Sequence, residues 1–398
     1  MSLEQRELLN SWKSVIGHVG DPIFSENFAG WKEVYAMDGK VSASLADIEA
    51  LATQSLVEAG ASRDQATAVA RNIAACERDD CKSHGLFRLP GYLKSILSGK
   101  VTPDASPVIR ELTPIIVHLD AAGGFAPLAH EVACVDIAER ARRFGMAALT
   151  ITNCYHFTAL WTELEPLAAA GLVAFAFRNG ISRVAQHGGR TPVFGTNPMA
   201  FAWPRRGKPP FIFDFATSEI ARGEIQLRQR NGESIPLGWA VDKEGQPTTD
   251  PAVGLAGAQL TFGGHKGSAL ATMIELLSGP FIGEMLSSEA LRADNGDGGP
   301  PRGGELLIVL DPTRFTGRAK QETAIDHAEI LFEQLQSDPG ARLAGDRRYA
   351  ARARNSAGLV TISPKLIEEL RGLAGPRTQE MLDMITLQGR GAAGQMAP

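Results

Sequence analysis

The sequence predicts an α/β fold, and three observations lead to this class. Residues 114–177 alternate between short apolar runs typical of strands and longer periodic runs typical of helices. The chain has 398 residues, 44% of them hydrophobic and 21% charged, which is enough to bury a large core. No predicted strand is followed by the Gly-x-Gly-x-x-Gly turn of a standard dinucleotide-binding sheet. The alternation alone would favour a parallel doubly wound sheet, but the missing turn leaves the strand arrangement open.

The N-terminal part predicts an extension followed by two helices. Residues 1–40 look like an extension whose apolar side chains could dock on the body of the protein or on a partner subunit. The main domain begins near Ser44, which with Asp47 could cap a helix. Apolar residues at helical spacing continue to Gly60, and Ser62 opens a second helix that leads towards residue 83.

The rest of the chain predicts further strands and helices separated by turn-rich loops. Strands are expected at 115–119, 146–151, 172–177 and 306–310. Helices are expected at 128–144, 158–170, 266–277, 322–335 and 363–370. Gly- and Pro-rich loops are expected at 188–210, 232–251 and 293–304. The main domain should therefore span residues 41–388, and the tail 389–398 should be disordered.

Composition narrows the function classes. The formal net charge of −5 gives no electrostatic reason to expect nucleic acid or an anionic membrane as a partner. No apolar run approaches the ~20 residues that span a bilayer, and the first residues lack the apolar core of a signal peptide. Four cysteines in so long a chain predict reduced thiols in a cytoplasmic protein. Histidines and carboxylates do not cluster at metal-ligand spacing, so no metal is expected.

Ser83-His84-Gly85, followed by Arg88, is the strongest candidate for chemistry. The spacing places an imidazole and a guanidinium about one helical turn apart. Histidine can transfer a proton near neutral pH, and arginine can hold a carboxylate through two parallel hydrogen bonds. The pair could orient a 2-oxo or 2-imino acid and protonate it during reduction. The alternatives are a capped helix end for His84 and a surface ion pair for Arg88.

Seven further motifs follow in order along the chain. They are 153–157 (NCYHF), 195–201 (GTNPMAF), 213–218 (FDFATS), 221–223 (ARG), 236–240 (PLGWA), 248–251 (TTDP) and 263–268 (GGHKGS). In this order and spacing they resemble the second malate/L-lactate dehydrogenase family, and the resemblance runs from about Ser44 to Pro364. It implies a non-Rossmann α/β fold with a largely antiparallel central sheet and surrounding helices. It also implies that residues 41–388 form a catalytic domain that binds NADPH, and that the protein is a homodimer.

One branch of this family is the most similar. The run around His265 and Lys266, where many members carry a tyrosine before the lysine, resembles the delta-1-piperideine-2-carboxylate/delta-1-pyrroline-2-carboxylate reductases, as does 346–350. The resemblance implies NADPH-dependent reduction of cyclic imino acids to L-pipecolate or L-proline. One alternative is a dehydrogenase of an open-chain 2-hydroxy acid of the malate, lactate, ureidoglycolate or diketogulonate type, for which NADH is possible. A more distant alternative is a non-catalytic binding protein.

The family resemblance also assigns roles to individual residues. It makes His84 the acid/base, with Ser83 in its relay, and it implies that Arg88 and Thr196 contact the substrate. Asp214, flanked by two phenylalanines, is expected to orient His84 or to contact the cofactor through the adjacent backbone, and these two roles stay open. His156 remains a rival of His84 for the acid role.

The cofactor site is expected to combine a helix start with basic side chains. Residues 156–160 lie where an apparent strand meets a helix, and N–H groups at a helix start attract phosphate. His265 and Lys266 could meet the extra phosphate of NADPH. The alternatives are a packed strand end and a solvated basic pair. The residues expected to bind the cofactor are His156, Phe157, Thr158, Ala159, Leu160, Asp214, Phe215, Ala216, His265, Lys266, Arg342, Arg347 and Arg348.

Overall fold

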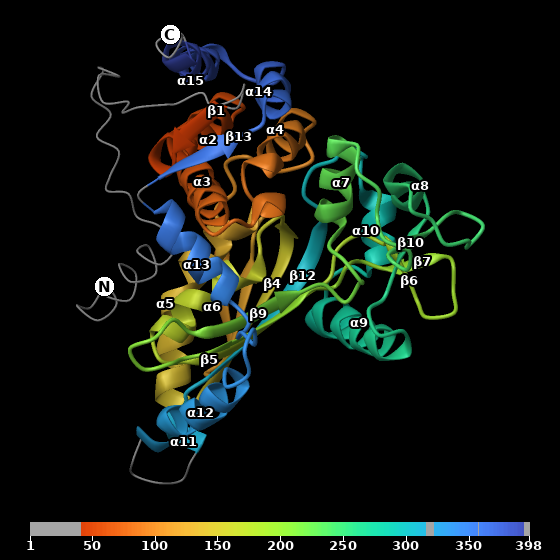
Figure 1. The fold of residues 1–398 in the computed structure, drawn as a ribbon. Helices are drawn as coiled ribbons and strands as arrows, with labels where there is room; N and C mark the ends of the chain where they lie inside the picture. The colour runs from red at the N-terminus through yellow and green to blue at the C-terminus, as the bar shows by residue number, and fades with distance from the viewer. Residues whose placement is uncertain (1–40, 316–321, 357, 394–398) are drawn as a thin grey trace. The chain divides into compact units, whose positions relative to one another are not determined.

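The computed structural model describes residues 41–315, 322–356 and 358–393, and Figure 1 traces them. The predicted extension over residues 1–40 lies outside the described residues. The described chain divides into two compact units, and both are discontinuous in sequence. Unit 1 contains 106–295 and 301–345, and unit 2 contains 41–105, 296–300 and the residues from 346 onward. The sequence analysis treated all of these residues as one domain and did not predict this division.

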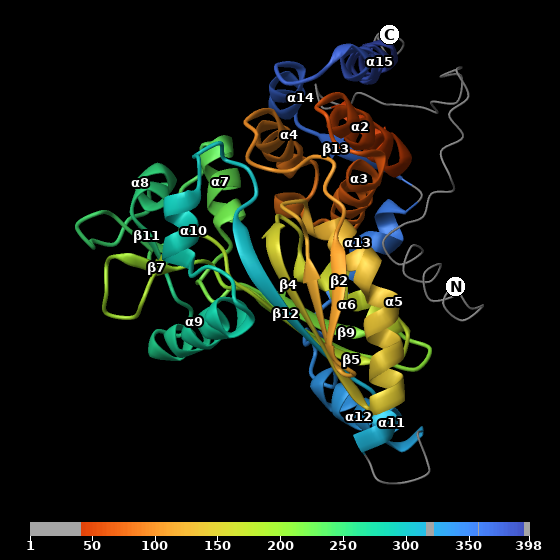
Figure 2. The ribbon, with the colours of Figure 1, turned by 180° about the vertical axis from the view of Figure 1, so that it is seen from behind.

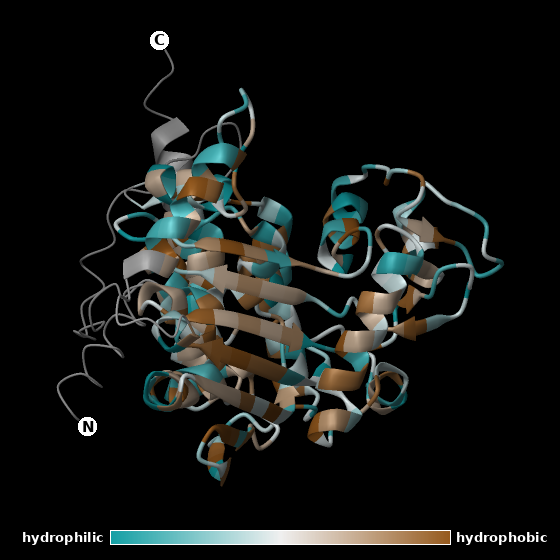
Figure 3. Cartoon of the chain, turned by 90° about the horizontal axis from the view of Figure 1, so that it is seen from below, coloured by the Kyte–Doolittle hydropathy of each residue, from teal (hydrophilic) through white to brown (hydrophobic). Residues whose placement is uncertain are grey.

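A seven-stranded sheet forms the centre of unit 1, and its strands are largely hydrophobic (Figure 3). Its strand order is β2 (Val108–Thr113), β3 (Ile116–Asp120), β4 (Met146–Tyr155), β12 (Arg302–Leu310), β5 (Val173–Arg178), β8 (Met199–Trp203) and β9 (Phe211–Phe215). Every neighbouring pair is antiparallel except β3 and β4. The predicted antiparallel sheet is therefore confirmed, and a parallel doubly wound sheet is excluded.

Helices cover both faces of this sheet. The crossover helix α5 (Ala126–Phe144) joins β3 to β4, and α6 (Leu160–Ala169) joins β4 to β5. Figure 2 shows α5 beside the strands. Glu305 of β12 contacts side chains from both helices, so α5 and α6 share one face of the sheet. On the other face, α9 (His265–Ser278) packs Ile274 against the neighbouring strands. Side chains alternate between faces along a strand, so the central strands are covered on both sides.

A small four-stranded sheet completes unit 1 together with short helices. Its strand order is β10 (Ala240–Val241), β11 (Ala258–Leu260), β6 (Val184–Ala185) and β7 (Pro192–Phe194). The other helices of unit 1 are α7 (Arg222–Asn231), α8 (Pro251–Ala256), η3 (Pro280–Ile282), α10 (Ser287–Ala293), α11 (Pro312–Phe315) and α12 (Glu322–Leu335).

Unit 2 is helical and joins segments from the two ends of the described chain. Its helices are α2 (Leu45–Glu58), α3 (Arg63–Arg78), η1 (Lys82–His84), η2 (Leu86–Arg88), α4 (Leu89–Leu97), α13 (Asp346–Asn355), α14 (Pro364–Arg371) and α15 (Pro376–Ala393). Strand β1 (Val41–Ser44) pairs antiparallel with β13 (Leu359–Ile362). The predicted cap is present: Asp47 N–H donates to Ser44 Oγ at 3.1 Å, and Ser44 N–H donates to Asp47 Oδ2 at 3.2 Å.

The expected start of the C-terminal tail needs a correction. Helix α15 continues through Ala393, so residues 389–393 are helical and only 394–398 lie outside the described part. The two glycines in this stretch raise the cost of a helix by about 1 kcal/mol each, but they do not break it as proline would. The adjacent alanines favour helix continuation.

No single helix among those described is both long and apolar enough to cross a membrane. One bent pair, His265–Ile282 with Ser287–Ala293, meets the length and composition of a broken span.

Candidate active site

The Ser83–His84–Arg88 motif lies in unit 2 on the two consecutive 3-10 turns η1 and η2, not on one regular helix. Ser83 Oγ lies 3.1 Å from His84 Nδ1, and the tautomer of the imidazole decides which atom donates. Arg88 Nε donates to the carbonyl oxygen of Ser83 at 2.7 Å. The sequence therefore placed these three residues correctly as one local group.

A buried glutamate fixes the turns that carry the motif. Glu77 Oε1 accepts a hydrogen bond from the N–H of Leu86 at 2.8 Å, and Glu77 Oε2 lies 2.6 Å from Lys82 Nζ. Gly85 lies so close to this carboxylate that a Cβ there would be 2.2 Å from Glu77 Oε1. Only glycine allows this approach without displacing Glu77. Sequence reasoning missed Glu77, because a glutamate near a helix end is usually solvated.

The surroundings keep His84 neutral in the free protein. Burial is the largest cause and the charge of Arg88 the second, and together they lower the pKa of His84 from 6.5 to about 3. Burial also lowers the pKa of Arg88 to about 10, so the guanidinium stays charged at pH 7. The group thus combines a fixed cation with an uncharged imidazole, which suits it to an anionic ligand that also exchanges a proton.

Thr196 lies in unit 1 on a turn that is held from two sides. Its carbonyl oxygen accepts hydrogen bonds from Thr217 N–H at 2.8 Å and from Thr217 Oγ1 at 3.0 Å. The preceding Gly195 donates its N–H to Ser287 Oγ at 2.9 Å. The half-buried side chain of Thr196 therefore projects from a backbone with a fixed course.

A second buried glutamate completes the support of this turn. Asn197 adopts a positive φ of 38° and donates Nδ2 to Glu275 Oε2 at 2.8 Å. Ser287 donates its N–H to Glu275 Oε1 at 2.5 Å and its hydroxyl to Oε2 at 2.7 Å. All three residues are buried. Sequence reasoning missed Glu275 and Ser287, which are 78 and 90 positions beyond Asn197 and carry no local signal.

Asp214 caps a helix, a role that the sequence did not suggest. Helix α6 begins after Ala159, which has no side chain that could cap it. Asp214, near the end of β9, instead accepts the N–H of Trp161 on its Oδ2 at 3.0 Å. A carboxylate at a helix start offsets the positive end of the helix dipole. The two roles expected for Asp214 stay predictions beside this one.

The side chains of the 156–160 segment point mainly into the protein. His156 and Thr158 are 5% and 6% exposed, and both contact Glu163 Oε1, at 2.8 Å from His156 Nε2 and 2.6 Å from Thr158 Oγ1. The start of α6 already holds the Asp214 carboxylate, which disfavours a phosphate at the same place. Any cofactor contact of this segment therefore depends on its backbone and on the half-buried Phe157.

His265 and Lys266 are the first two residues of α9, and both are exposed. Gly264, with φ of 61°, forms the turn into the helix. Phe262 donates its N–H to the carbonyl oxygen of Thr217 at 3.0 Å. This bond ties the start of α9 to the turn that carries Thr196, so two predicted parts of the site are connected within unit 1.

The remaining predicted cofactor residues are divided between the units. Phe215 is 41% exposed and stacks on Phe213, with ring centroids 4.9 Å apart, and the half-buried Ala216 follows it. Arg342 lies in unit 1, between α12 and α13, whereas Arg347 and Arg348 lie on α13 in unit 2. The cofactor role of these residues stays a prediction.

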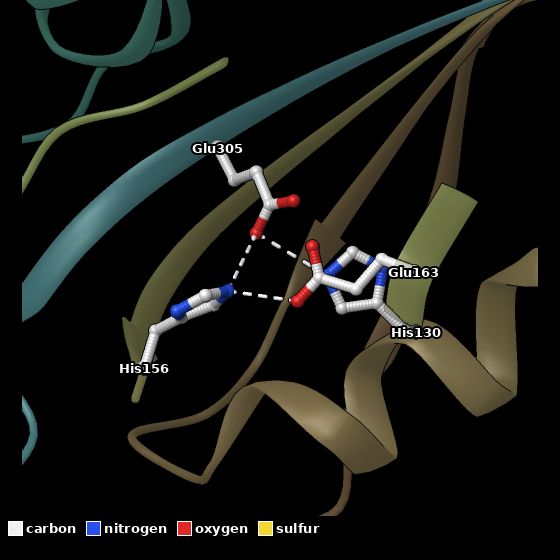
Figure 4. A group of neighbouring side chains, drawn as sticks. All are labelled: His130, His156, Glu163 and Glu305. Atoms are coloured by element: carbon white, nitrogen blue, oxygen red, sulfur yellow. Dashed lines mark hydrogen bonds and ion pairs between the residues drawn. The ribbon is translucent and has the colours of Figure 1, made fainter. Parts of the chain in front are cut away.

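The sequence shows no metal-ligand spacing, but the folded chain has a group of side chains that could hold a metal. The fold brings together His130, His156, Glu163 and Glu305, whose possible ligand atoms lie within 4.8 Å of one another (Figure 4). Sequence spacing could not reveal this group, because His130 and Glu305 are 175 residues apart. That no metal binds stays a prediction.

The fold and these motifs agree with the comparisons to known proteins. A family model described as malate/L-lactate dehydrogenase matches residues 43–371, and the chain belongs to this family of nicotinamide-dependent oxidoreductases. Within the family, the chain is 49% identical over 341 residues to a Delta(1)-pyrroline-2-carboxylate reductase of Ancylobacter novellus, covering 86% of this chain and 99% of that protein.

Two other relatives carry related names. A Delta(1)-pyrroline-2-carboxylate/Delta(1)-piperideine-2-carboxylate reductase of Pseudomonas aeruginosa is 49% identical over 330 residues, covering 83% of this chain and 98% of that protein. The crystal structure of delta1-piperideine-2-carboxylate reductase from Pseudomonas syringae superposes with a TM-score of 0.78 at 41% identity, covering 84% and 99% of the two chains. The predicted family, fold class and enzyme class are confirmed.

Proposed function

We propose that this chain reduces delta-1-piperideine-2-carboxylate and delta-1-pyrroline-2-carboxylate to L-pipecolate and L-proline with NADPH. The observation that carries the proposal is the compact group of Ser83, His84 and Arg88, in which a charged guanidinium stands beside a neutral imidazole. Relatives at 47–49% identity are named as reductases of these cyclic imino acids. The reduction of a cyclic imino acid needs a group that binds the substrate carboxylate and a group that donates a proton.

The residues of unit 1 fit a phosphorylated nicotinamide nucleotide. His265 and Lys266 expose two basic side chains at the start of α9, where the helix dipole also favours an anion. The half-buried Thr196 and the exposed Phe215 add a hydroxyl and an aromatic face within the same unit. When bound, the reduced nicotinamide supplies the hydride that is added to C2 of the substrate.

The protein's own residues bind the substrate and move the proton. Arg88 holds the carboxylate through two parallel hydrogen bonds. Ser83 hydrogen-bonds Nδ1 of His84, which leaves Nε2 to deliver a proton to the ring nitrogen. The C=N double bond becomes a single bond as one C–H bond and one N–H bond form.

Substrate binding would raise the pKa of His84. The positive charge of Arg88 is one of the two causes that lower the pKa of His84. A carboxylate placed on Arg88 offsets that charge, so the pKa of His84 rises when the substrate binds. The imidazole then takes up the proton that it passes to the substrate nitrogen.

The test is NADPH oxidation followed at one enzyme concentration with cyclic imino acids and open-chain 2-oxo acids side by side. The proposal expects the highest kcat/KM for a cyclic imino acid. A higher kcat/KM for an open-chain 2-oxo acid would favour the dehydrogenase alternative. We also propose a homodimer in the cytoplasm, and light scattering coupled to gel filtration checks the subunit number.

A further inference from the structure

Four ionisable side chains meet in the interior of unit 1, between the central sheet and helices α5 and α6 (Figure 4). His130 Nε2 lies 3.2 Å from Glu305 Oε2 and 3.4 Å from Glu163 Oε1. His156 Nε2 lies 2.8 Å from Glu163 Oε1 and 3.7 Å from Glu305 Oε2. Each residue is at most 5% exposed. We call these four residues the His–Glu cluster.

Within the described part of the chain, an ion pair with an arginine is seen for Glu305 and not for Glu163. Arg178 of β5 is buried, and its Nη1 lies 4.0 Å from Glu305 Oε2. Its guanidinium also donates to the backbone carbonyls of Gly303 and Pro301, at 3.1 and 3.3 Å. Ionised Glu305 and Arg178 together are neutral. With both imidazoles uncharged, an ionised Glu163 would therefore add an unbalanced negative charge to a buried site.

We propose that Glu163 is held protonated beside an ionised Glu305, and that this neutral cluster positions residues 156–161 for nucleotide binding. The positioning part rests on the proposed function, since it takes this segment as part of the nucleotide site. Glu163 is a positioning residue here, because it acts through His156 and Thr158.

The contacts explain how the cluster fixes this segment. His156 and Thr158 point from the turn after β4 to the same oxygen of Glu163, which lies in the first turn of α6. Further along the chain, the N–H of Trp161 donates a hydrogen bond to Asp214. The turn is therefore tied to α6 on one side and to β9 on the other.

The surrounding groups favour a protonated Glu163 and an ionised Glu305. Burial and the charge of Glu305 raise the pKa of Glu163 well above 4.5. The pKa of Glu305 is lowered although burial opposes this, because His130 and His156 face it. The other ionisable groups facing the cluster are Arg178 and the thiol of Cys154 on β4, whose pKa burial raises to about 12.

A bound metal ion is the competing explanation. Two imidazoles and two carboxylates are suitable zinc ligands, but a metal site would need both glutamates ionised. The two explanations therefore differ in what they require of Glu163. Glutamine has the shape of a protonated glutamate and cannot replace an ionised one.

The test compares Glu163→Gln, Glu163→Ala and Glu305→Gln in the full chain, with Glu368→Gln as the control for loss of an exposed carboxylate. Glu163→Gln should keep the Kd for NADPH, measured by calorimetry without substrate, within about twofold of the unmodified protein. Glu163→Ala, which leaves His156 and Thr158 without their partner, should raise that Kd about tenfold or more. Glu305→Gln should lower Tm, because Arg178 loses its counter-charge.

The pH dependence of Tm gives a readout that does not involve nucleotide or catalysis. A raised pKa in the folded state means that Glu163 contributes fully below pH 4.5, and that this contribution is lost as the pH rises through the folded pKa. Glutamine does not titrate. The Tm of Glu163→Gln relative to the unmodified protein should therefore rise with pH, whereas that of Glu368→Gln should show no such rise.

Three results would overturn the inference. A Glu163→Gln variant that is as destabilised as Glu305→Gln at neutral pH would mean that Glu163 is ionised. Stoichiometric metal in the purified protein, lost in Glu163→Gln, would make the cluster a metal site. An unchanged Kd for NADPH in a folded Glu163→Ala variant would remove the positioning role. If the protein bound no NADPH at all, the proposed function would fail, and the Tm measurements would still decide the protonation state.

Discussion

The chemistry of His84 depends on two neighbours that act in different ways. Partial burial and the charge of Arg88 keep the imidazole neutral, and Ser83 forms a hydrogen bond with its Nδ1 atom. A histidine with its ordinary pKa would be partly charged near neutral pH before any substrate arrived. Under the proposed mechanism, a substrate carboxylate on Arg88 raises the pKa of His84 and so favours proton uptake.

Replacing the imidazole tests this role directly. His84→Ala should lower kcat for the best substrate by ~10²-fold or more, because the general acid is lost. The Kd for NADPH should stay close to that of the unmodified protein, since the basic pair proposed for its phosphate lies on α9. A variant with nearly normal kcat would show that another group supplies the proton.

Replacing Arg88 with lysine separates the effect of its positive charge from the effect of its hydrogen-bond geometry. Arg88→Lys keeps a positive charge but cannot form two parallel hydrogen bonds with a carboxylate, so KM for the imino acid should rise about tenfold or more. Arg354→Lys is the matched control, because Arg354 is exposed and forms a surface ion pair with Asp80. Equal KM values in the two variants would place the carboxylate site elsewhere.

Short segments of secondary structure position the site through their ends. The turns η1 and η2 are held by Glu77, α6 is capped by Asp214, and α9 begins with two basic residues. In each case the carboxylate or the basic pair lies at the start of a helix. The first backbone N–H groups there have no hydrogen-bond partner within the helix. Changes at these ends should therefore affect ligand binding more than changes in the middle of the same helices.

Gly85 is the most sensitive of these positions in unit 2. In Gly85→Ala the new methyl group would meet Glu77 Oε1 at 2.2 Å, so Glu77 must move and release the N–H of Leu86. We expect kcat/KM to fall about tenfold or more, with a lower Tm. Gly372→Ala is the control, since its Cβ would have only ordinary contacts at 3.5 Å and beyond. Normal kinetics in Gly85→Ala would contradict the tight fit.

The start of α9 should decide the choice of nucleotide. His265→Gln combined with Lys266→Gln should erase most of a preference for NADPH over NADH. A charged hydrogen bond to the extra phosphate contributes ~1.5–3 kcal/mol, roughly a tenfold to hundredfold preference. The ratio of kcat/KM values for the two nucleotides measures it, with the exposed Lys243→Gln as control. Equal use of NADPH and NADH by the unmodified enzyme would contradict this assignment.

Local features were predictable from the sequence, and long-range contacts were not. The Ser44–Asp47 cap and the Ser83–His84–Arg88 group depend on residues a few positions apart, and both were found. The cap from Asp214 to Trp161 spans 53 residues, and His130 contacts Glu305 across 175. Such contacts depend on the order of strands in the sheet. The alternation of strands and helices left the strand arrangement open, and the family resemblance implied that the sheet is largely antiparallel.

At the scale of the whole molecule, unit 2 brings together residues that are far apart in the sequence. Glu58, at the end of α2, accepts hydrogen bonds from the N–H groups of Arg377 and Thr378 and from the Thr378 hydroxyl, at 2.8, 3.0 and 2.6 Å. Burial would raise the pKa of Glu58, but the hydrogen bonds from Thr378 and Arg377 outweigh it and lower the pKa. Glu58 therefore caps α15 in its ionised form.

Removing this charge should loosen the C-terminal helix. Glu58→Gln should lower Tm and speed proteolysis near residue 376, because a neutral amide caps the positive end of α15 poorly. The loss should shrink as the pH falls through the lowered pKa of Glu58, since the protonated glutamate no longer contributes there. Glu380→Gln, at an exposed position on the same helix, is the control. Equal proteolysis of both variants would argue against the cap.

The pairing of β1 with β13 also has a consequence for synthesis on the ribosome. Strand β1 is made before the central sheet of unit 1, and its partner β13 is made more than 300 residues later, after that sheet. Unit 1 can bury its sheet while unit 2 still lacks β13, α14 and α15. Unit 2, which carries Ser83, His84 and Arg88, therefore cannot be completed until residues 359–393 have been made, and until then it can be exposed to chaperones or proteases.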